Sequence, residues 1–511
     1  MPPESLPGIL VKGLSSGYEV EHLVRVFFPG AKPVGASARD EAEPTGRIPK
    51  GPLVYARAGR RQLAAGLRLG GRVAVRRAPL NAATAGDEKA LKLTLCRLLY
   101  DLLKDETGLR PPWGLLTGVR PLSLLRKQCA AGGEAVAEAH FLQKCDVSRE
   151  KYDLACRIAD TQRPFLEQNA PPGYSLYVSI PFCPTRCAYC SFVSKTIARE
   201  GHLIGPYLEK LELELAETAK AAKENGLELR TIYIGGGTPT ALDEAQLDTL
   251  LAAVARHFDT RAVTEYTVEA GRPDCTSPAK LALLRQYGVG RVSINPQSMR
   301  DEVLRAIGRS HNAQDIRNCY AEAQKLGFDA INMDLIAGLP GDDIAGFIET
   351  LDEVIALAPG NLTLHTLTLK RASDLAQQRA DDSSSPAAML KAAYPKMAAA
   401  GYHPYYLYRQ KSTLENLENT GWTKPGLEGV YNICIMEEVH SILAVGAGAV
   451  TKLVAGGPET AIKRLYNHKF PADYLAGHET VLERKRGVKD FYAGNLDSQT
   501  PGGDRADQHG G

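Results

Sequence analysis

The sequence predicts an α/β protein whose central part is built on a parallel sheet. Between residues 174 and 375, short apolar segments alternate with amphipathic helical segments, a pattern typical of parallel strands joined by right-handed crossovers. Six such strand and helix units can be placed. With 511 residues, the chain is long enough for about two to four domains, because single cores rarely grow past about 250 to 300 residues.

The six strands are predicted from short apolar runs bounded by turn-forming residues. Six units suit an open, partial (β/α)6 barrel, although the count alone also allows a full eight-fold barrel. Loops that leave the C-terminal ends of parallel strands carry active sites in α/β folds, so chemistry is expected there. The predicted strands cover residues 176–182, 231–234, 265–269, 291–295, 330–336 and 362–369.

Smaller elements are expected on both sides of the barrel. Residues 88–103 carry apolar side chains at helical spacing, and residues 446–449 form a glycine-rich turn. The tail is rich in Gly, Asp and Gln, a composition typical of disorder. The predicted parts are an N-terminal α+β domain (1–105), a helical connector (106–170), the barrel (171–380), a C-terminal α+β region (381–494) and a disordered tail (495–511).

The composition, 44% hydrophobic and 23% charged, is that of an ordinary globular protein. A formal net charge of +2 gives no electrostatic case for binding nucleic acid or an anionic membrane. The sequence contains no signal peptide pattern and no apolar run of about 18 residues that would suggest an integral membrane segment. A cytoplasmic location is therefore expected, where thiols stay reduced.

Three of the ten cysteines follow the first predicted strand in a C-x3-C-x2-C pattern: Cys183, Cys187 and Cys190. Iron–sulfur clusters normally take four thiolates, so this spacing supplies three ligands to a four-iron cluster and leaves one iron open to another ligand. The alternatives are packed cysteines or a zinc site, but zinc knuckles come in pairs and no second one lies within reach. The other cysteines are scattered and are expected to be mostly small core residues.

The wider string around the motif resembles the radical S-adenosylmethionine (SAM) enzymes, and among them the oxygen-independent coproporphyrinogen III dehydrogenases and their relatives. That string is Tyr177-x-x-Ile180-Pro181-Phe182-Cys183-x3-Cys187-x-Tyr189-Cys190-x-Phe192. The resemblance covers roughly residues 170–380 and extends more loosely into the C-terminal region. It implies a [4Fe–4S] cluster and SAM as cofactors, with the SAM amino and carboxylate groups on the open iron and a 5′-deoxyadenosyl radical that abstracts hydrogen.

A glycine-rich string follows the second strand, Gly235-Gly-Gly-Thr-Pro-Thr240. By itself it is consistent with an ordinary turn, in which missing Cβ atoms let a ligand approach the backbone. Behind the cysteine motif it resembles the loop that holds the SAM amino group, which implies contacts from Gly236, Gly237 and Thr238.

Polar residues at or just beyond successive strands resemble the family's other SAM contacts, although each alone is more often a surface residue or a helix cap. Gln and Asp suit ribose hydroxyls, and the fork of Arg309 suits a carboxylate. The resemblance also implies aromatic walls beside the adenine. The implied contacts are Glu269, Gln297, Arg309 and Asp334, with Tyr177 and Tyr189 as the walls.

In the dehydrogenases that this chain resembles, the radical takes a hydrogen from a propionate side chain and decarboxylation leaves a vinyl group, twice per coproporphyrinogen III. Those enzymes carry a fourth cysteine where this chain has Phe192, and a histidine where it has Ser179. Relatives without that cysteine are haem chaperones, but their C-terminal His-Asn-x-x-Tyr-Trp string is here replaced by residues 431–436. A longer dehydrogenase paralogue of Gram-positive bacteria fits better, through residues 113–121, 365–373 and 431–452.

Two hypotheses of different classes follow. The first is a radical oxidoreductase that takes a tetrapyrrole substrate and a low-potential electron donor. The second is a haem-binding chaperone, and a barrel that merely retains a structural cluster comes third. Lys370 and Arg371 are candidates for gripping substrate carboxylates, with a solvated helix start as the equal alternative. The lone His440 is expected to be a packed residue and not a ligand.

Overall fold

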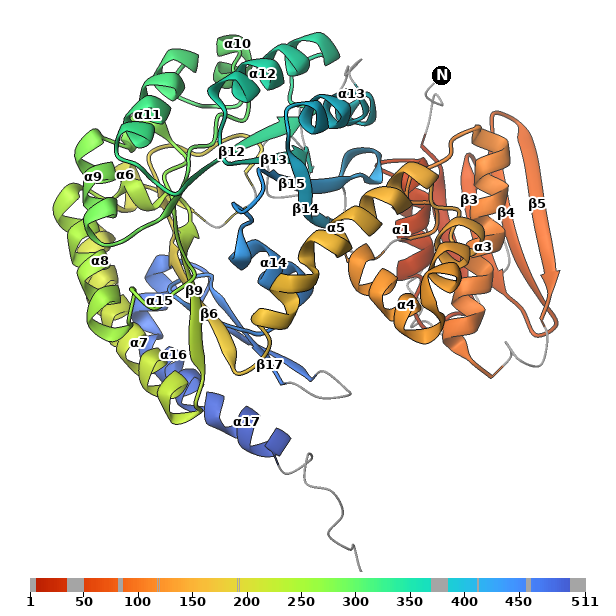
Figure 1. Cartoon of the computed structure of the whole chain (residues 1–511). Coiled ribbons are helices and arrows are strands. Elements are labelled where there is room, and N and C mark those ends of the chain that lie inside the picture. The colour runs from red at the N-terminus through yellow and green to blue at the C-terminus, as the bar shows by residue number, and fades with distance from the viewer. Residues whose placement is uncertain are drawn as a thin grey trace, which may run out of the picture. The chain divides into compact units, whose positions relative to one another are not determined.

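The computed structural model describes residues 6–34, 50–80, 86–116, 118, 120–190, 192, 194–368, 385–410, 413–455 and 461–496. The chain divides into two compact units (Figure 1). The first contains Met1–Cys156 and Arg409–Glu418, and the second contains Arg157–Tyr408 and Asn419–Gly511. The five ranges expected from the sequence are a finer division and stay a prediction; most of the expected disordered tail lies outside the described residues.

The first unit is an α+β fold on a five-stranded sheet of order β2-β1-β3-β4-β5. Strand β1 pairs in parallel with β2 and β3, and β3 to β5 form an antiparallel meander. Helix α3 begins at the N-cap Asp87 and ends where Gly108 adopts φ +68°, four residues later than predicted. The elements are β1 (Gly8–Lys12), α1 (Tyr18–Phe27), β2 (Lys32–Pro33), β3 (Leu53–Ala58), β4 (Gln62–Leu69), β5 (Arg72–Pro79), α3 (Glu88–Thr107), α4 (Pro121–Glu138) and η1 (Ala139–Lys144), before α5 (Arg149–Gln168).

The second unit is built on an eleven-stranded sheet of order β14-β15-β13-β12-β11-β10-β9-β6-β16-β17-β18. The six predicted strands are neighbours in this sheet and run parallel, which confirms the predicted α/β class and its six strands. The first of them ends two residues earlier than predicted, because Pro181 has no N–H to continue the ladder. These strands are β6 (Gly173–Ile180), β9 (Glu228–Gly236), β10 (Glu265–Glu269), β11 (Arg291–Ser293), β12 (Ala330–Ala337) and β13 (Asn361–Thr366).

Helices, most of them with one buried face, connect the parallel strands and follow one another around the outer side of the sheet (Figure 1). Helix α8 is typical: Asp243 and Gln246 form a capping box at its start, and its buried residues recur at helical spacing. Among the helices in the described part of the chain, none is both long and apolar enough to cross a membrane. The connecting helices are α6 (Ile197–Glu200), α7 (Ile204–Glu224), α8 (Glu244–His257), α9 (Pro278–Gln286), α10 (Asp301–Ala306), α11 (Ala313–Lys325) and α12 (Ile344–Leu357).

The C-terminal residues extend the same sheet at both ends. Strand β16 pairs in parallel with β6, and β17 and β18 continue antiparallel from it. At the other end, β15 pairs antiparallel with β13. The elements are α13 (Pro386–Ala399), β14 (His403–Arg409), β15 (Glu418–Thr423), α14 (Val430–Glu437), β16 (Ser441–Val445), β17 (Val450–Val454), β18 (Ile462–Tyr466), α15 (Pro471–Ala476), α16 (His478–Arg486) and α17 (Val488–Leu496).

The glycine-rich turn between β16 and β17 is fixed beside the end of β6 by a buried charged pair. Gly446, with φ +95°, donates its N–H to Glu214 Oε2 at 2.8 Å, and Ser179 Oγ donates to the Ala447 carbonyl at 2.9 Å. Lys485 Nζ lies 3.1 Å from Glu214 Oε1, and both side chains are almost completely buried. The turn therefore holds the strand from which the cysteine loop leaves.

Replacing Lys485 by methionine is expected to weaken this end of the sheet by about 3 kcal/mol, because Glu214 would stay buried without its cation. Amide hydrogen exchange in β16 measures the local opening free energy. The control is Lys396→Met, which removes a surface pair with Asp352 at 2.9 Å and is expected to cost less than about 1 kcal/mol. Equal losses in the two variants would contradict the assignment.

Candidate active site at the carboxyl edge of the barrel strands

The three motif cysteines lie on the loop that leaves β6, starting at the short strand β7 (Phe182–Cys183). All three thiols are free; Cys187 is buried and the other two are partly buried. Backbone hydrogen bonds shape the loop, from Cys190 N to the Cys187 carbonyl at 3.0 Å and from Ala188 N to the Ile307 carbonyl at 3.0 Å. Burial raises the pKa of the Cys183 and Cys190 thiols, so thiolates there need a positive partner such as bound iron.

The glycine-rich string lies directly against the cysteine loop. Gly237 N donates to the Ile180 carbonyl and Thr238 N donates to the Phe182 carbonyl, both at 2.8 Å. Thr238 Oγ1 also lies 3.5 Å from Cys183 Sγ, close enough to donate to sulfur. Gly236 has φ +107°, which only glycine adopts readily. The two predicted segments, far apart in sequence, therefore form one continuous wall.

An alanine at Gly237 is expected to push these two segments apart. Its Cβ would lie 2.7 Å from the Phe182 carbonyl oxygen and 2.9 Å from the Ile180 carbonyl oxygen, both of them backbone atoms. We expect a loss of about 1 to 3 kcal/mol in stability and at least about tenfold in SAM affinity, measured by thermal unfolding and calorimetric titration. Gly205→Ala is the control, since its Cβ would meet nothing within 4 Å.

Glu269 ends β10 and contacts one of three stacked tyrosine rings. It accepts a hydrogen bond from Tyr233 at 2.7 Å, and the Tyr233 ring stacks on Tyr431 at 4.4 Å between centroids. Tyr177 stacks on both rings, at 6.1 and 6.4 Å. Burial, aided by the charge of Asp334, raises the pKa of Glu269 to about 7 despite the Tyr233 hydrogen bond.

Arg309 contacts Tyr189, which is itself part of the cysteine loop. The Arg309 guanidinium is buried and donates to Tyr189 Oη at 2.8 Å and to the Gly271 carbonyl at 2.9 Å. Its Nε has no hydrogen-bond partner among the described residues. Two of the donors predicted to grip a carboxylate thus already have protein partners in this structure.

Gln297, which follows β11, lies beside Asp334 in β12. Gln297 has φ +70°, and its backbone N–H donates to the Asp334 carbonyl at 2.8 Å. The Asp334 carboxylate accepts from Asn332 Nδ2 at 2.8 Å, and His365 Nε2 lies 3.5 Å from its other oxygen. Burial opposes ionisation of Asp334, but hydrogen bonds from His365 and Asn332 hold its pKa below the ordinary value.

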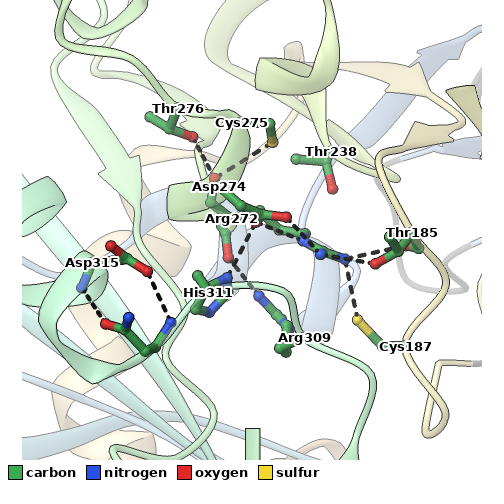
Figure 2. A network of polar contacts seen from close by, with 12 residues as sticks. Thr185, Cys187, Thr238, Arg272, Asp274, Cys275, Thr276, Arg309, His311 and Asp315 are labelled. Carbon is green, nitrogen blue, oxygen red and sulfur yellow. Dashed lines mark hydrogen bonds and ion pairs between the residues drawn. The ribbon is translucent and has the colours of Figure 1, made fainter. Parts of the chain in front are cut away.

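Sequence reasoning missed a polar network around Arg272 that contacts the cysteine loop (Figure 2). Arg272 is almost fully buried and connects Asp274 with the loop, and His311 Nδ1 lies 3.1 Å from Asp274. Partial burial opposes ionisation of Asp274, yet hydrogen bonds from His311 and Arg272 hold its pKa well below the usual range. The only sequence signal was an Arg-Pro-Asp string three residues after Glu269.

The remaining candidates lie elsewhere. His440 is completely buried, with its ring nitrogens 2.8 Å from Ser175 Oγ and 2.7 Å from the Asn169 carbonyl, which confirms a packing role. Phe192, at the position of the missing fourth cysteine, is 69% exposed. Lys370 and Arg371 lie outside the described residues, so their role stays a prediction.

The residues present fit a bound cluster and SAM. The three motif thiols lie on one loop, and glycines without Cβ atoms line the wall beside them. Several buried polar atoms in the candidate active site have no hydrogen-bond partner among the described residues. Such atoms cost folding free energy, and a polar ligand that hydrogen-bonds to them would lower that cost. These atoms are Asn295 Oδ1, Gln297 Oε1, Arg309 Nε and His311 Nε2.

Comparison with known proteins decides the family. Residues 177–354 match the model of the Radical SAM superfamily. Over 406 residues the chain is 39% identical to the oxygen-independent coproporphyrinogen-III oxidase-like protein HemZ of Bacillus subtilis, covering 78% of this chain and 81% of the relative. The chain belongs to the radical SAM superfamily. Members of this superfamily use a [4Fe–4S] cluster and SAM, so the predicted cofactors are confirmed.

Within this radical SAM superfamily, the chain groups with coproporphyrinogen oxidase-like proteins and haem chaperones. It is 31% identical over 324 residues to the haem chaperone HemW of Bacillus subtilis, covering 61% of this chain and 80% of the relative. Among solved structures, the coproporphyrinogen III oxidase HemN of Escherichia coli aligns with a TM-score of 0.48 and 24% identity, covering 62% of this chain and 72% of that chain.

Proposed function

We propose that this chain is a radical SAM oxidoreductase that converts two propionate side chains of coproporphyrinogen III to vinyl groups. The observation that carries the proposal is the joined wall formed by the cysteine loop and the glycine-rich string, where Thr238 Oγ1 reaches Cys183 Sγ at 3.5 Å. The tetrapyrrole substrate rests on the similarity to HemZ. Each conversion removes one hydrogen atom, one CO2 and one electron from a propionate, and SAM is the oxidant, because its cleavage to methionine and 5′-deoxyadenosine consumes one electron and one hydrogen atom.

The residues of the candidate active site have distinct proposed roles. Cys183, Cys187 and Cys190 hold the cluster, which together with SAM supplies reductive cleavage and hydrogen-atom abstraction. The backbone of the glycine-rich string receives the SAM amino group. Arg309 holds the carboxylate, through its free Nε or by exchanging a protein partner.

The other residues of the candidate active site position the nucleoside part of SAM. Glu269, Gln297 and Asp334 offer oxygen acceptors or an amide to the ribose hydroxyls and the charged methionine part. Tyr177 and Tyr189 flank the site as apolar walls. Their task is positioning and the exclusion of water, because no protein acid or base is needed for hydrogen-atom abstraction.

The alternative is a haem-binding chaperone, favoured by Phe192 in place of a fourth cysteine and by the similarity to HemW. A chaperone would bind haem tightly and leave coproporphyrinogen unchanged. The low-potential electron donor and the cytoplasmic location belong to the proposed oxidoreductase and are part of the same proposal.

One anaerobic experiment separates the two functions. The reconstituted protein is given SAM, a low-potential reductant and coproporphyrinogen III, while 5′-deoxyadenosine and tetrapyrrole mass are followed together. Loss of two carboxyl groups with matching deoxyadenosine supports the oxidoreductase. Deoxyadenosine without a change in tetrapyrrole mass overturns the substrate, and a parallel haem titration by visible absorption then tests the chaperone.

A further inference from the structure

The guanidinium of Arg272 is held as a rigid fork against the cysteine loop (Figure 2). On one side, Nε donates to Asp274 Oδ1 at 3.1 Å and Nη2 to Asp274 Oδ2 at 2.9 Å. On the other side, Nη1 donates to the Thr185 carbonyl at 3.1 Å and Nη2 to Thr185 Oγ1 at 2.9 Å. The bidentate pair with Asp274 fixes the plane of the guanidinium, so the loop-facing donors have a set direction.

One of those donors points at a thiol. Arg272 Nη1 lies 3.6 Å from Cys187 Sγ, and both residues are buried. The acceptor here is a thiol sulfur, which stands in for the thiolate that an iron ligand must be. A thiolate accepts a hydrogen bond more strongly than a thiol does. The low dielectric of a buried site strengthens the N–H···S hydrogen bond further.

Two neighbouring groups keep the fork in place. His311, whose side chain is fully buried, has Nδ1 3.1 Å from Asp274 Oδ1 and thereby restrains the carboxylate. Thr185 Oγ1 lies 3.3 Å from the Gly308 carbonyl, which ties the cysteine loop to the turn after α10. Lysine cannot reproduce this arrangement, because an ammonium has no planar fork that spans Asp274 and two loop groups.

We infer that Arg272 is a positioning residue that holds the cysteine loop and donates an N–H···S hydrogen bond to Cys187, which raises the reduction potential of the cluster. Such a bond, like a nearby positive charge, stabilises the more negative reduced state. The inference rests on the proposed role of the three cysteines as iron ligands and not on the tetrapyrrole substrate.

The test is a dye-mediated redox titration of the anaerobically reconstituted protein, followed by the electron paramagnetic resonance of the reduced cluster. In Arg272→Gln, the ratio of oxidised to reduced cluster at the wild-type midpoint is expected to rise at least tenfold, or about 59 mV for one electron. Arg272→Lys keeps the positive charge but loses the planar guanidinium. The ratio of oxidised to reduced cluster is therefore expected to rise in this variant too, but less than in Arg272→Gln. Iron and sulfide analysis accompanies each titration.

The matched control is Arg291→Gln. Arg291 is also a largely buried arginine, but it starts β11 at the opposite edge of the sheet, where Nη2 donates to the carbonyls of Leu427 and Glu428 at 3.0 and 3.2 Å. Its substitution is expected to leave the ratio of oxidised to reduced cluster at the wild-type value. A shift of the same size in the control overturns the inference, because it would then reflect general loosening of the barrel.

The remaining outcomes are decisive in either direction. A wild-type ratio in an iron-loaded Arg272→Gln protein overturns the inference and leaves the cluster assignment intact. If Arg272→Gln takes up no iron, Arg272→Lys decides, since a shifted ratio supports the hydrogen bond and an unchanged one overturns it. Wild-type protein that binds no iron would end both the cluster assignment and this inference.

Discussion

Alanine in place of Cys187 is expected to abolish radical chemistry while leaving the protein folded. Cys187 is the most buried of the three motif cysteines, and Arg272 Nη1 lies 3.6 Å from its sulfur. A cluster held by two thiolates loses its geometry and its protection, so we expect substoichiometric iron and a fall in 5′-deoxyadenosine formation of at least about 10³-fold. Iron analysis and a SAM cleavage assay measure the two effects.

The control for this substitution is Cys319→Ala. Cys319 is also buried and belongs to the same unit, but it lies on α11, within the helical layer. Its loss is expected to cost about 1 kcal/mol of packing and to leave iron content and SAM cleavage unchanged. A Cys187→Ala protein with full iron and full SAM cleavage would contradict the assignment of the three thiolates.

The six parallel strands could be predicted because their signal is local. Each strand is a short apolar run between turn residues, and strand-to-helix alternation leaves few topologies open. The same holds for the cysteine loop and the glycine-rich string, since residues close in sequence form each of them. Errors were confined to element ends, as where Pro181 stops β6 before the predicted Phe182.

Contacts between distant segments could not be predicted. Strand β16 joins the sheet beside β6, although more than 250 residues separate them in sequence. Tyr431 of α14 stacks on Tyr233, the tyrosine that donates to Glu269, while Arg272 and His311 both contact Asp274. Hydrophobic periodicity indicates which face of a helix or strand a residue occupies. It does not indicate which residue of another element contacts that face.

Glutamine in place of Glu269 is expected to weaken SAM binding and to stabilise the fold at the same time. The Glu269 carboxylate has a pKa raised to about 7 by burial, so keeping it ionised above that pH costs folding free energy. Relative to the unfolded chain, this cost grows as the pH rises from about 4.5 through 7. At pH 8 we expect Glu269→Gln to be more stable by on the order of 2 kcal/mol, allowing for partial exposure of the side chain.

The affinity for SAM is expected to change in the opposite sense. An ionised carboxylate accepts hydrogen bonds strongly and favours a positively charged sulfonium, so its removal is expected to cost about tenfold to a hundredfold at pH 8. In the wild type, affinity is expected to fall as the pH drops below 7 and Glu269 takes up a proton. That pH dependence disappears in Glu269→Gln, and titration calorimetry between pH 6 and 8 measures both effects.

Two companion variants make this prediction specific. Tyr233→Phe keeps the ring stack but removes the hydroxyl that donates to Glu269 at 2.7 Å, so the pH at which affinity falls is expected to rise. Glu265→Gln changes a buried carboxylate at the other end of β10, where it accepts from Val430 N at 2.6 Å, and is expected to leave SAM affinity unchanged. Affinity that is equally pH-dependent in Glu269→Gln and in the wild type would show that another group controls the binding of SAM, because glutamine does not titrate in this range.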